Sequence, residues 1–147
     1  MKYEEYLNKA IVLIREAKID IENSCYNKAV SAIWFSIEAT FRAILNYYRH
    51  PIPSKSGALI AGTISFIHKQ KLLSQKEIVR LSLASSLYTL RNEIDHKRTL
   101  ASTKTIRRAI QYAREILLIL RKFMRSRAPE IEETLDRMIL EIGQISK

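Results

Sequence analysis

The sequence predicts an all-α protein, an up-and-down helical bundle of four to five helices followed by a C-terminal helix. Apolar residues recur three and four positions apart along most of the chain, as they do on the buried face of an amphipathic helix. The 147 residues include only 3 Gly and 3 Pro, which leaves little material for a turn-rich β fold. A hydrophobic content of 47% with 27% charged residues is ordinary for a globular domain that builds its own core.

The first half of the chain predicts three helices. Residues 3–22 have an apolar stripe on one face, made by Tyr3, Leu7, Ala10, Ile14, Ala17 and Ile21. The stripe over residues 25–49 is broader, which predicts a helix with neighbours on two sides, and it contains Val30, Trp34, Ile37, Phe41, Ile44 and Tyr48. In this helix, Glu38 and Arg42 are four residues apart and predict a surface ion pair. Pro51 and Pro53 end the helix, and residues 56–72 predict a third, less regular one.

A fourth helix is expected to begin at Ser74 and to continue to His96. Ser74 and Glu77 form the S-x-x-E pattern of a capping box, in which each side chain satisfies a free amide of the other residue. The expected core stripe contains Val79, Leu83, Leu87, Leu90 and Ile94. At 100° per residue, a second face collects Ser85, Tyr88, Asn92, Asp95 and His96, with Arg91 at its edge.

After a short link at residues 100–102, a fifth helix runs to about Arg125. Arg107, Arg114 and Arg121 recur every seven residues, so they predict a cationic ridge that Arg125 extends. A final helix is predicted from Pro129, with an apolar stripe that needs a partner surface. We expect residues 1–127 to form the bundle and residues 128–147 to add a helix that packs either on the bundle or on a second subunit.

The net charge of +10 is concentrated in one segment. Residues 97–127 contain ten of the 25 Lys and Arg residues but only one of the 15 acids, and the rest of the chain is nearly balanced. Such a concentration is typical of a contact with nucleic acid or another polyanion. The alternative is a solvated helix face in a protein that happens to be basic.

Other patterns exclude several classes of protein. The single Cys25 supports neither an internal disulfide nor a Cys-rich metal site, and no catalytic motif of a metalloprotease, nucleotide triphosphatase or serine hydrolase occurs. We therefore expect no metal and no cofactor. His50 and His68 have no partners at ligand spacing. The chain contains neither an apolar run of membrane-spanning length nor an N-terminal signal segment, so a cytoplasmic location without membrane contact is expected.

The segment Arg91-Asn92-x-x-x-His96, near the end of a helix, resembles the R-N-x-x-x-H signature of HEPN domains. A second helix with Glu38-x-x-x-Arg42-Ala43-Ile44-Leu45 is also similar to that family. The resemblance covers roughly residues 3–125. It implies a helical bundle, often a homodimer, in which the motif helices of two subunits face each other across a composite cleft.

The resemblance also implies a function. Many HEPN proteins are metal-independent ribonucleases, frequently toxins or defence enzymes paired with a nucleotidyltransferase-type antitoxin, whereas others bind RNA or nucleotides without catalysis. In the antitoxin-paired branch the histidine is commonly followed by x-Tyr, but here Lys97 and Arg98 follow His96. The expected partners are therefore a second copy of the chain, RNA or a nucleotide, and, for the paired branch, such an antitoxin.

The chemistry of these side chains suits RNA cleavage without a metal. His96 is the expected general base for the ribose 2′-hydroxyl, Arg91 the cation for the phosphorane, and Asn92 an orienting group. Auxiliary polar residues are expected at Asp95, Tyr88 and Glu38, and RNA-binding residues at Lys97, Arg98, Arg107, Arg114, Arg121 and Arg125. Two alternatives remain: Arg91 and His96 as favourable cations at a helix carboxyl end, or a module that binds RNA, a nucleotide or a protein without turnover.

Overall fold

The computed structural model describes residues 2–96 and 100–145, and in these ranges it contains helices and no β-strand. The all-α bundle predicted from the sequence is confirmed. The helices are α1 (Tyr3–Glu22), α2 (Tyr26–Tyr47), α3 (Ser56–Lys69), α4 (Gln75–Arg80), α5 (Leu83–His96), α6 (Thr103–Met124) and α7 (Pro129–Ile145). The second and third helices are slightly shorter than the expected 25–49 and 56–72.

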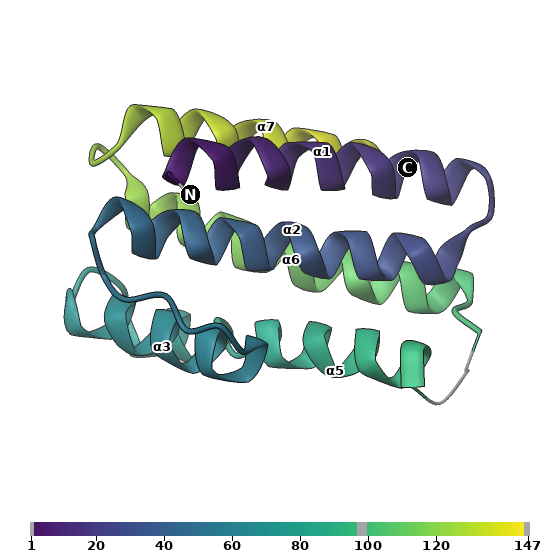
Figure 1. The fold of residues 1–147 in the computed structure, drawn as a ribbon, viewed down its shortest axis with the longest axis horizontal. Helices are drawn as coiled ribbons and strands as arrows, with labels where there is room; N and C mark the ends of the chain where they lie inside the picture. The colour runs from purple at the N-terminus through teal and green to yellow at the C-terminus, as the bar shows by residue number, and fades with distance from the viewer. Residues whose placement is uncertain (1, 97–99, 146–147) are drawn as a thin grey trace.

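The long helices form three layers (Figure 1). Helices α1 and α7 lie side by side in one outer layer, α2 and α6 form the middle layer, and α3 and α5 form the other outer layer. Contacts at both ends show that α2 and α6 run in the same direction: Asn27 accepts a hydrogen bond from the backbone of Ala101, and Tyr47 donates one to the carbonyl of Arg127. The beginnings of α2 and α6 therefore lie at the same end of the bundle as the carboxyl end of α5.

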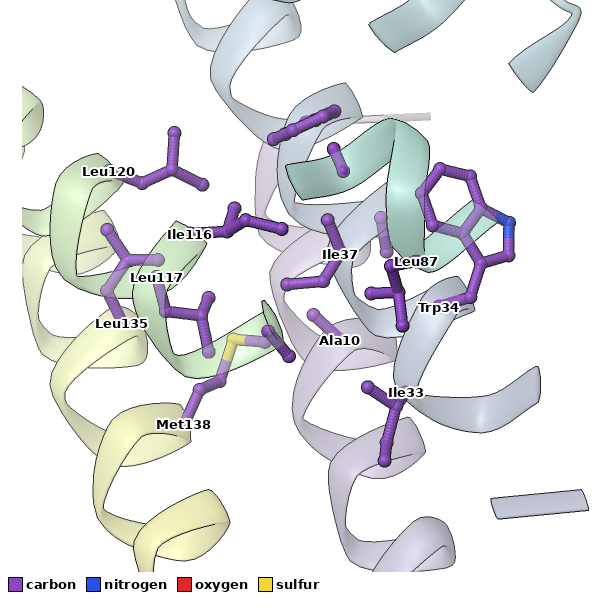
Figure 2. Close-up of a cluster of buried hydrophobic side chains, with 14 of the residues drawn as sticks. Ala10, Ile33, Trp34, Ile37, Leu87, Ile116, Leu117, Leu120, Leu135 and Met138 are labelled. Atoms are coloured by element: carbon purple, nitrogen blue, oxygen red, sulfur yellow. The ribbon is translucent and has the colours of Figure 1, made fainter. Parts of the chain in front are cut away.

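The core is continuous through the three layers and is centred on α2. Thirteen of the 22 residues of α2 are buried, which agrees with the broad stripe that predicted neighbours on two sides. Trp34, Ile37 and Phe41 are fully buried, and Figure 2 shows Trp34 and Ile37 among side chains of α5, α6 and α7. The buried hydroxyls of Ser36 and Thr40 donate to backbone carbonyls of their own helix, so they add no unpaired polar group to the core.

Helix α7 packs on its own chain. Ile131, Leu135, Met138 and Ile142 are completely buried against α1 and α6. At its surface, Arg15 Nε donates to Glu141 Oε1 at 3.0 Å, which fastens α1 to α7. The apolar stripe that required a partner surface therefore has one within the bundle.

The single fourth helix predicted from Ser74 to His96 is wrong. The capping box at Ser74 and Glu77 is present, but α4 ends at Arg80 and α5 begins at Leu83. Between them the amide of Ser82 bonds to the carbonyl of Val79, three residues back, and this tighter turn changes the phase of the apolar face. As a result Val79, predicted in the core, is 58% exposed, whereas Leu81 is fully buried.

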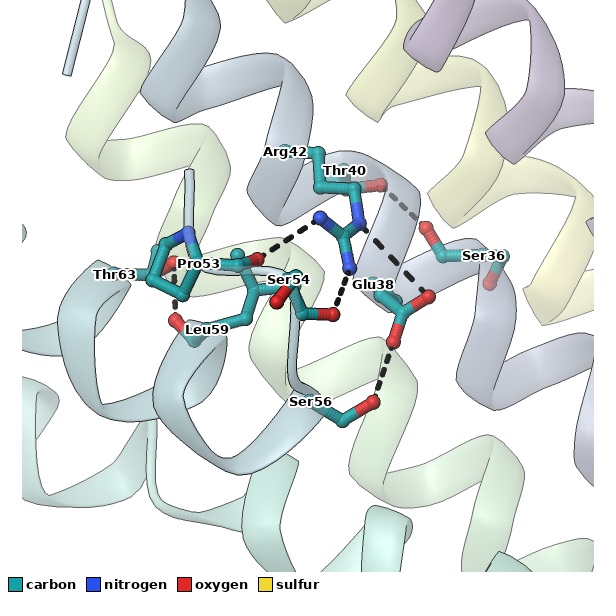
Figure 3. Close-up of polar contacts among 9 residues, drawn as sticks. All are labelled: Ser36, Glu38, Thr40, Arg42, Pro53, Ser54, Ser56, Leu59 and Thr63. Carbon is teal, nitrogen blue, oxygen red and sulfur yellow. Dashed lines mark hydrogen bonds and ion pairs between the residues drawn. The ribbon is translucent and has the colours of Figure 1, made fainter. Parts of the chain in front are cut away.

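The predicted surface ion pair of Glu38 and Arg42 has a different role. Both side chains are largely covered, with exposed fractions of 17% and 19%. The guanidinium of Arg42 donates to the carbonyls of Pro53 and Ser54, and Glu38 accepts a hydrogen bond from the hydroxyl of Ser56 at 2.8 Å (Figure 3). The pair therefore holds the α2–α3 connection against α2. Helix periodicity could not predict this role, because it depends on the connection folding back over α2.

Several helices end in a left-handed residue that is not glycine. Ser24, Arg49, Lys71 and Ser126 have φ angles between 56° and 61°, and they follow α1, α2, α3 and α6. After α1, the amide of Cys25 reaches the carbonyl of Asp20 at 2.7 Å, which closes the helix and turns the chain into α2. No helix in the described ranges combines the length and apolar character that a membrane span requires.

Candidate functional site

The motif residues occupy the last two turns of α5, where the helix is only partly covered. Ala84, Leu87 and Ile94 are the buried residues of α5, and they face the middle layer. Arg91 and Asn92 are partly exposed, and Asp95 and His96 are exposed. Helix geometry thus places the polar residues along the border between the α2 contact and solvent.

Arg91 is fixed by three contacts. Its Nε lies 2.7 Å from Asp95 Oδ2, and its Nη1 donates to Asn92 Oδ1 at 3.2 Å. Its guanidinium carbon lies 5.0 Å from the centroid of the Phe35 ring on α2. The contact with Phe35 and the ion pair hold the planar fork in one orientation, so little ordering remains to be done when an anion binds.

The hydrogen bond from Arg91 also orients Asn92. Because Oδ1 accepts from Nη1, the amide Nδ2 is left as a donor with no partner among the described residues. Arg91 Nη2 is likewise without a partner in this part of the chain. Two neighbouring side chains therefore present N–H donors from one small area of α5, which is a suitable arrangement for oxygens of a phosphate.

His96 lies in the last turn of α5, one turn beyond Asn92, and therefore on the same side of the helix. The imidazole is exposed and has no hydrogen-bond partner within residues 2–96 and 100–145. His50 and His68 lie at the opposite end of the bundle, beyond α2 and near the end of α3. Since α2 is 22 residues long, that end is roughly 30 Å away.

The structure does not bring two of the predicted auxiliary residues, Tyr88 and Glu38, to Arg91. The ring of Tyr88 packs on Trp34 with centroids 5.1 Å apart, so this tyrosine belongs to the α2–α5 contact. Glu38 contacts Arg42 and Ser56, and these contacts hold the α2–α3 connection against α2. Only Asp95, the third auxiliary residue, contacts Arg91 directly.

The predicted RNA-binding residues differ in whether the structure describes them and in whether they form an ion pair. Lys97 and Arg98 lie outside the described residues. Arg107 and Arg114 are exposed on α6 and border a shallow hollow of about 370 Å³ that also contacts Leu118. Neither arginine forms an ion pair with the described residues, so both are available to an anion.

Arg121 and Arg125 are placed differently. Arg121 forms an ion pair with Asp136 of α7, and this carboxylate raises the pKa of the guanidinium further above its ordinary value. Arg125 follows the last residue of α6 and is exposed. From Arg107 to Arg121, α6 advances roughly 20 Å away from the end that lies near His96. The predicted ridge therefore has no ion pair at Arg107 and Arg114 among the described residues, and it is partly neutralised at Arg121, toward the end of α6.

Sequence reasoning missed the groove beside the motif. A hollow of about 480 Å³ lies between α1, the first half of α2 and the end of α5, and both Phe35 and Asp95 line it. Asn27, also at its wall, accepts from the amide of Ala101 at 2.7 Å and so anchors the segment before α6. In the sequence, the one indication of this groove is Phe35, a large aromatic residue beside the apolar stripe of α2. The groove could not be predicted from it, because the other residues of its wall include residues of α1 and α5.

Within the described ranges, no three His, Cys, Asp or Glu side chains are grouped as metal ligands. No family model, curated protein or solved structure matches this chain. The HEPN resemblance accordingly depends on the motif residues and their helices alone, and the function must be inferred from the geometry.

Proposed function

We propose that this protein is a metal-independent endoribonuclease that cleaves RNA through the ribose 2′-hydroxyl. The observation that carries the proposal is the arrangement of Arg91, Asn92 and His96 at the open end of α5. Two preoriented donors, on Arg91 and Asn92, lie five and four residues before an exposed imidazole on the same helix. These are the groups that a metal-free transesterification needs, and they lie near the most basic segment of the chain.

In the proposed reaction, neutral His96 accepts the proton of the 2′-hydroxyl, and the resulting oxygen attacks the adjacent phosphorus. Arg91 Nη2 and Asn92 Nδ2 donate to the phosphoryl oxygens, where negative charge increases in the transition state. The bond from phosphorus to the 5′-oxygen breaks, and that oxygen takes a proton. The products are a 2′,3′-cyclic phosphate and a free 5′-hydroxyl, so DNA is not a substrate.

The proton for the leaving oxygen requires a second group. His50 and His68 are too far from the motif, and one subunit contributes a single imidazole at this end. We infer that two copies of the chain associate with their α5 ends facing each other. The His96 of the second copy then acts as the acid.

The exposed Arg107 and Arg114 favour a second candidate, a module that binds RNA without cleaving it. Their guanidinium groups have no carboxylate partner among the described residues, as a phosphate-binding surface requires. In that case reversal of both charges weakens RNA binding and reduces its salt dependence, and substitution of His96 has little effect.

The deciding experiment incubates mixed-sequence RNA with wild-type, His96→Ala and His68→Ala proteins in the presence of EDTA, and maps the ends that form. We expect cyclic-phosphate ends from wild type and His68→Ala. The His96→Ala rate should be lower by about 10²–10⁴-fold, the usual contribution of a general base. His68 is an exposed histidine at the far end of the bundle and is the matched control.

Circular dichroism and size-exclusion chromatography would establish that the three proteins share one fold and one oligomeric state. Equal cleavage by wild type and His96→Ala would contradict the assignment of the base. RNA left intact by wild type, but bound in a manner that depends on Arg107 and Arg114, would favour the second candidate.

A further inference from the structure

The groove between α1, α2 and α5 continues from the proposed phosphate-binding residues. Asp95 binds Arg91 Nε and also lines the groove, and Phe35 lies beneath the Arg91 guanidinium and lines the groove as well. A nucleotide whose phosphate is bound by Arg91 therefore has this hollow directly beside it. A volume of about 480 Å³ is within the range of pockets that hold small ligands.

The walls of the groove suit a flat heterocycle. Leu13, Ala32 and Phe35 supply apolar surface, and Ser31 supplies a hydroxyl. RNA-binding proteins commonly hold an unstacked base in this way, with apolar or aromatic contacts to its face and hydrogen bonds to its edge. The groove is open to solvent.

The charges lining the groove disfavour a second phosphate there. Glu16 and Asp20 contribute carboxylates from α1, and Lys28 contributes one ammonium group from α2. None of these three groups has an ion-pair partner among the described residues. The charge of Asp95 is balanced by Arg91, so two carboxylates and one ammonium group remain, and the groove is net acidic in an otherwise basic protein. Such a groove accepts hydrogen-bond donors and repels phosphate oxygens.

Among the RNA bases, guanine matches this combination of groups best. Its pairing edge presents two adjacent N–H donors, which complement the two oxygens of a carboxylate, next to a carbonyl acceptor, which complements an ammonium group. Uracil presents one donor between two acceptors. Adenine and cytosine each present an amino group beside an unprotonated ring nitrogen, which a carboxylate would repel.

We propose that the α1–α2–α5 groove is a base-binding subsite that selects guanine next to the cleaved phosphodiester. This inference rests on the proposed ribonuclease function and adds a sequence preference to it. Glu16 and Asp20 accept from the guanine edge, Lys28 donates to its carbonyl oxygen, and Phe35 contacts the ring.

The test compares wild type with a Glu16→Gln/Asp20→Asn variant, which removes both carboxylates with little change in shape. The matched control is Glu5→Gln/Glu22→Gln, which removes two exposed carboxylates of the same helix outside the groove. Each protein is given RNAs that differ only in the nucleotide flanking a single cleavable linkage, and kcat/KM is measured for each RNA. A parallel nuclear magnetic resonance titration of His96→Ala protein with guanosine or uridine follows the amides of Ser31 and Ala32.

We expect wild type and the control variant to favour guanine over uracil by about tenfold or more, as a bidentate base contact provides. The groove variant should lose that preference, with kcat/KM for the guanine RNA falling to the value for the uracil RNA. Guanosine, but not uridine, should shift the two amide signals. Cleavage by wild type without a guanine preference, or a preference retained by the groove variant, would overturn the proposal.

The failure of the ribonuclease proposal has a different signature. If wild type cleaves no RNA, the catalytic assignment is wrong, and the nucleoside titration alone then decides the groove. Guanosine-specific shifts would support a base-binding site without catalysis, whereas the absence of shifts would reject the subsite.

Discussion

Helices α2 and α5 lie against each other but differ greatly in how much of their surface is covered. Thirteen of the 22 residues of α2 are buried, compared with three of the 14 residues of α5. The difference follows from their positions, because α2 is in the middle layer and α5 is in an outer layer with one side open (Figure 1). Helix α2 provides much of the core, and helix α5 carries the polar motif.

The contact between these two helices orients Arg91 while leaving it accessible to a ligand. Phe35 belongs to the well-packed α2, and the centroid of its ring lies 5.0 Å from the guanidinium carbon of Arg91 on the more open α5. A functional arginine on an exposed helix would otherwise sample many rotamers, at an entropic cost on binding. The candidate site is therefore located where a well-packed helix can orient side chains of a solvent-accessible one.

The largest expected effect is on the free energy of unfolding, and it contrasts a buried residue of α2 with an exposed residue of α5. Phe41→Ala in α2 removes a fully buried ring, and we expect the free energy of unfolding to fall by about 3–5 kcal/mol. Thr89→Ala in α5 changes an exposed residue, and we expect a change within about 0.5 kcal/mol. Chemical denaturation of both variants measures the contrast. Similar losses would contradict the burial of Phe41 or the exposure of Thr89.

A second prediction separates orientation from charge. Arg91→Lys keeps the positive charge but cannot contact Asp95, Asn92 and the Phe35 face with one planar group. We expect RNA cleavage to slow by about 10²–10³-fold, as when a transition-state donor is removed. The free energy of unfolding should change by about 1 kcal/mol, because lysine keeps the charge beside Asp95 and the pair is partly exposed. Full activity in the lysine variant would show that charge alone suffices.

The smallest expected effect concerns the cap of α4, outside the motif. Glu77 accepts from Lys122 Nζ at 2.8 Å and from the amide of Ser74, and these contacts lower the pKa of its carboxyl group. Because the folded pKa lies below the unfolded one, the stabilisation is present above the ordinary pKa and is lost as the pH falls through the folded value.

Glu77→Gln tests this contribution, since glutamine can keep the capping box but not the charge. We expect the variant to be less stable than wild type at pH 7 by about 1 kcal/mol or less. The two proteins should converge as the pH falls through the lowered pKa of Glu77, which thermal melting at a series of pH values would measure. A constant difference across that range would assign the effect to shape instead of charge.

Part of the candidate site was predictable from the sequence and part was not. The order of residues placed Arg91, Asn92 and His96 on one helix near its end, because helical spacing is a local property. The sequence did not reveal Phe35 beneath Arg91, or the carboxylates Glu16 and Asp20 beside it, because these come from other helices. The predicted role of Glu38 near the motif likewise depended on which loop would cover it.

The sequence by itself determined the all-helical class, most helix positions and the central place of α2. Those features follow from apolar periodicity, proline positions and capping residues, all of which act over a few residues. Only the tertiary structure decided the break between α4 and α5, the packing of α7 on its own chain and the groove beside Asp95. Each of these depends on which distant surfaces meet, and burial of apolar area is a property of the whole packed chain.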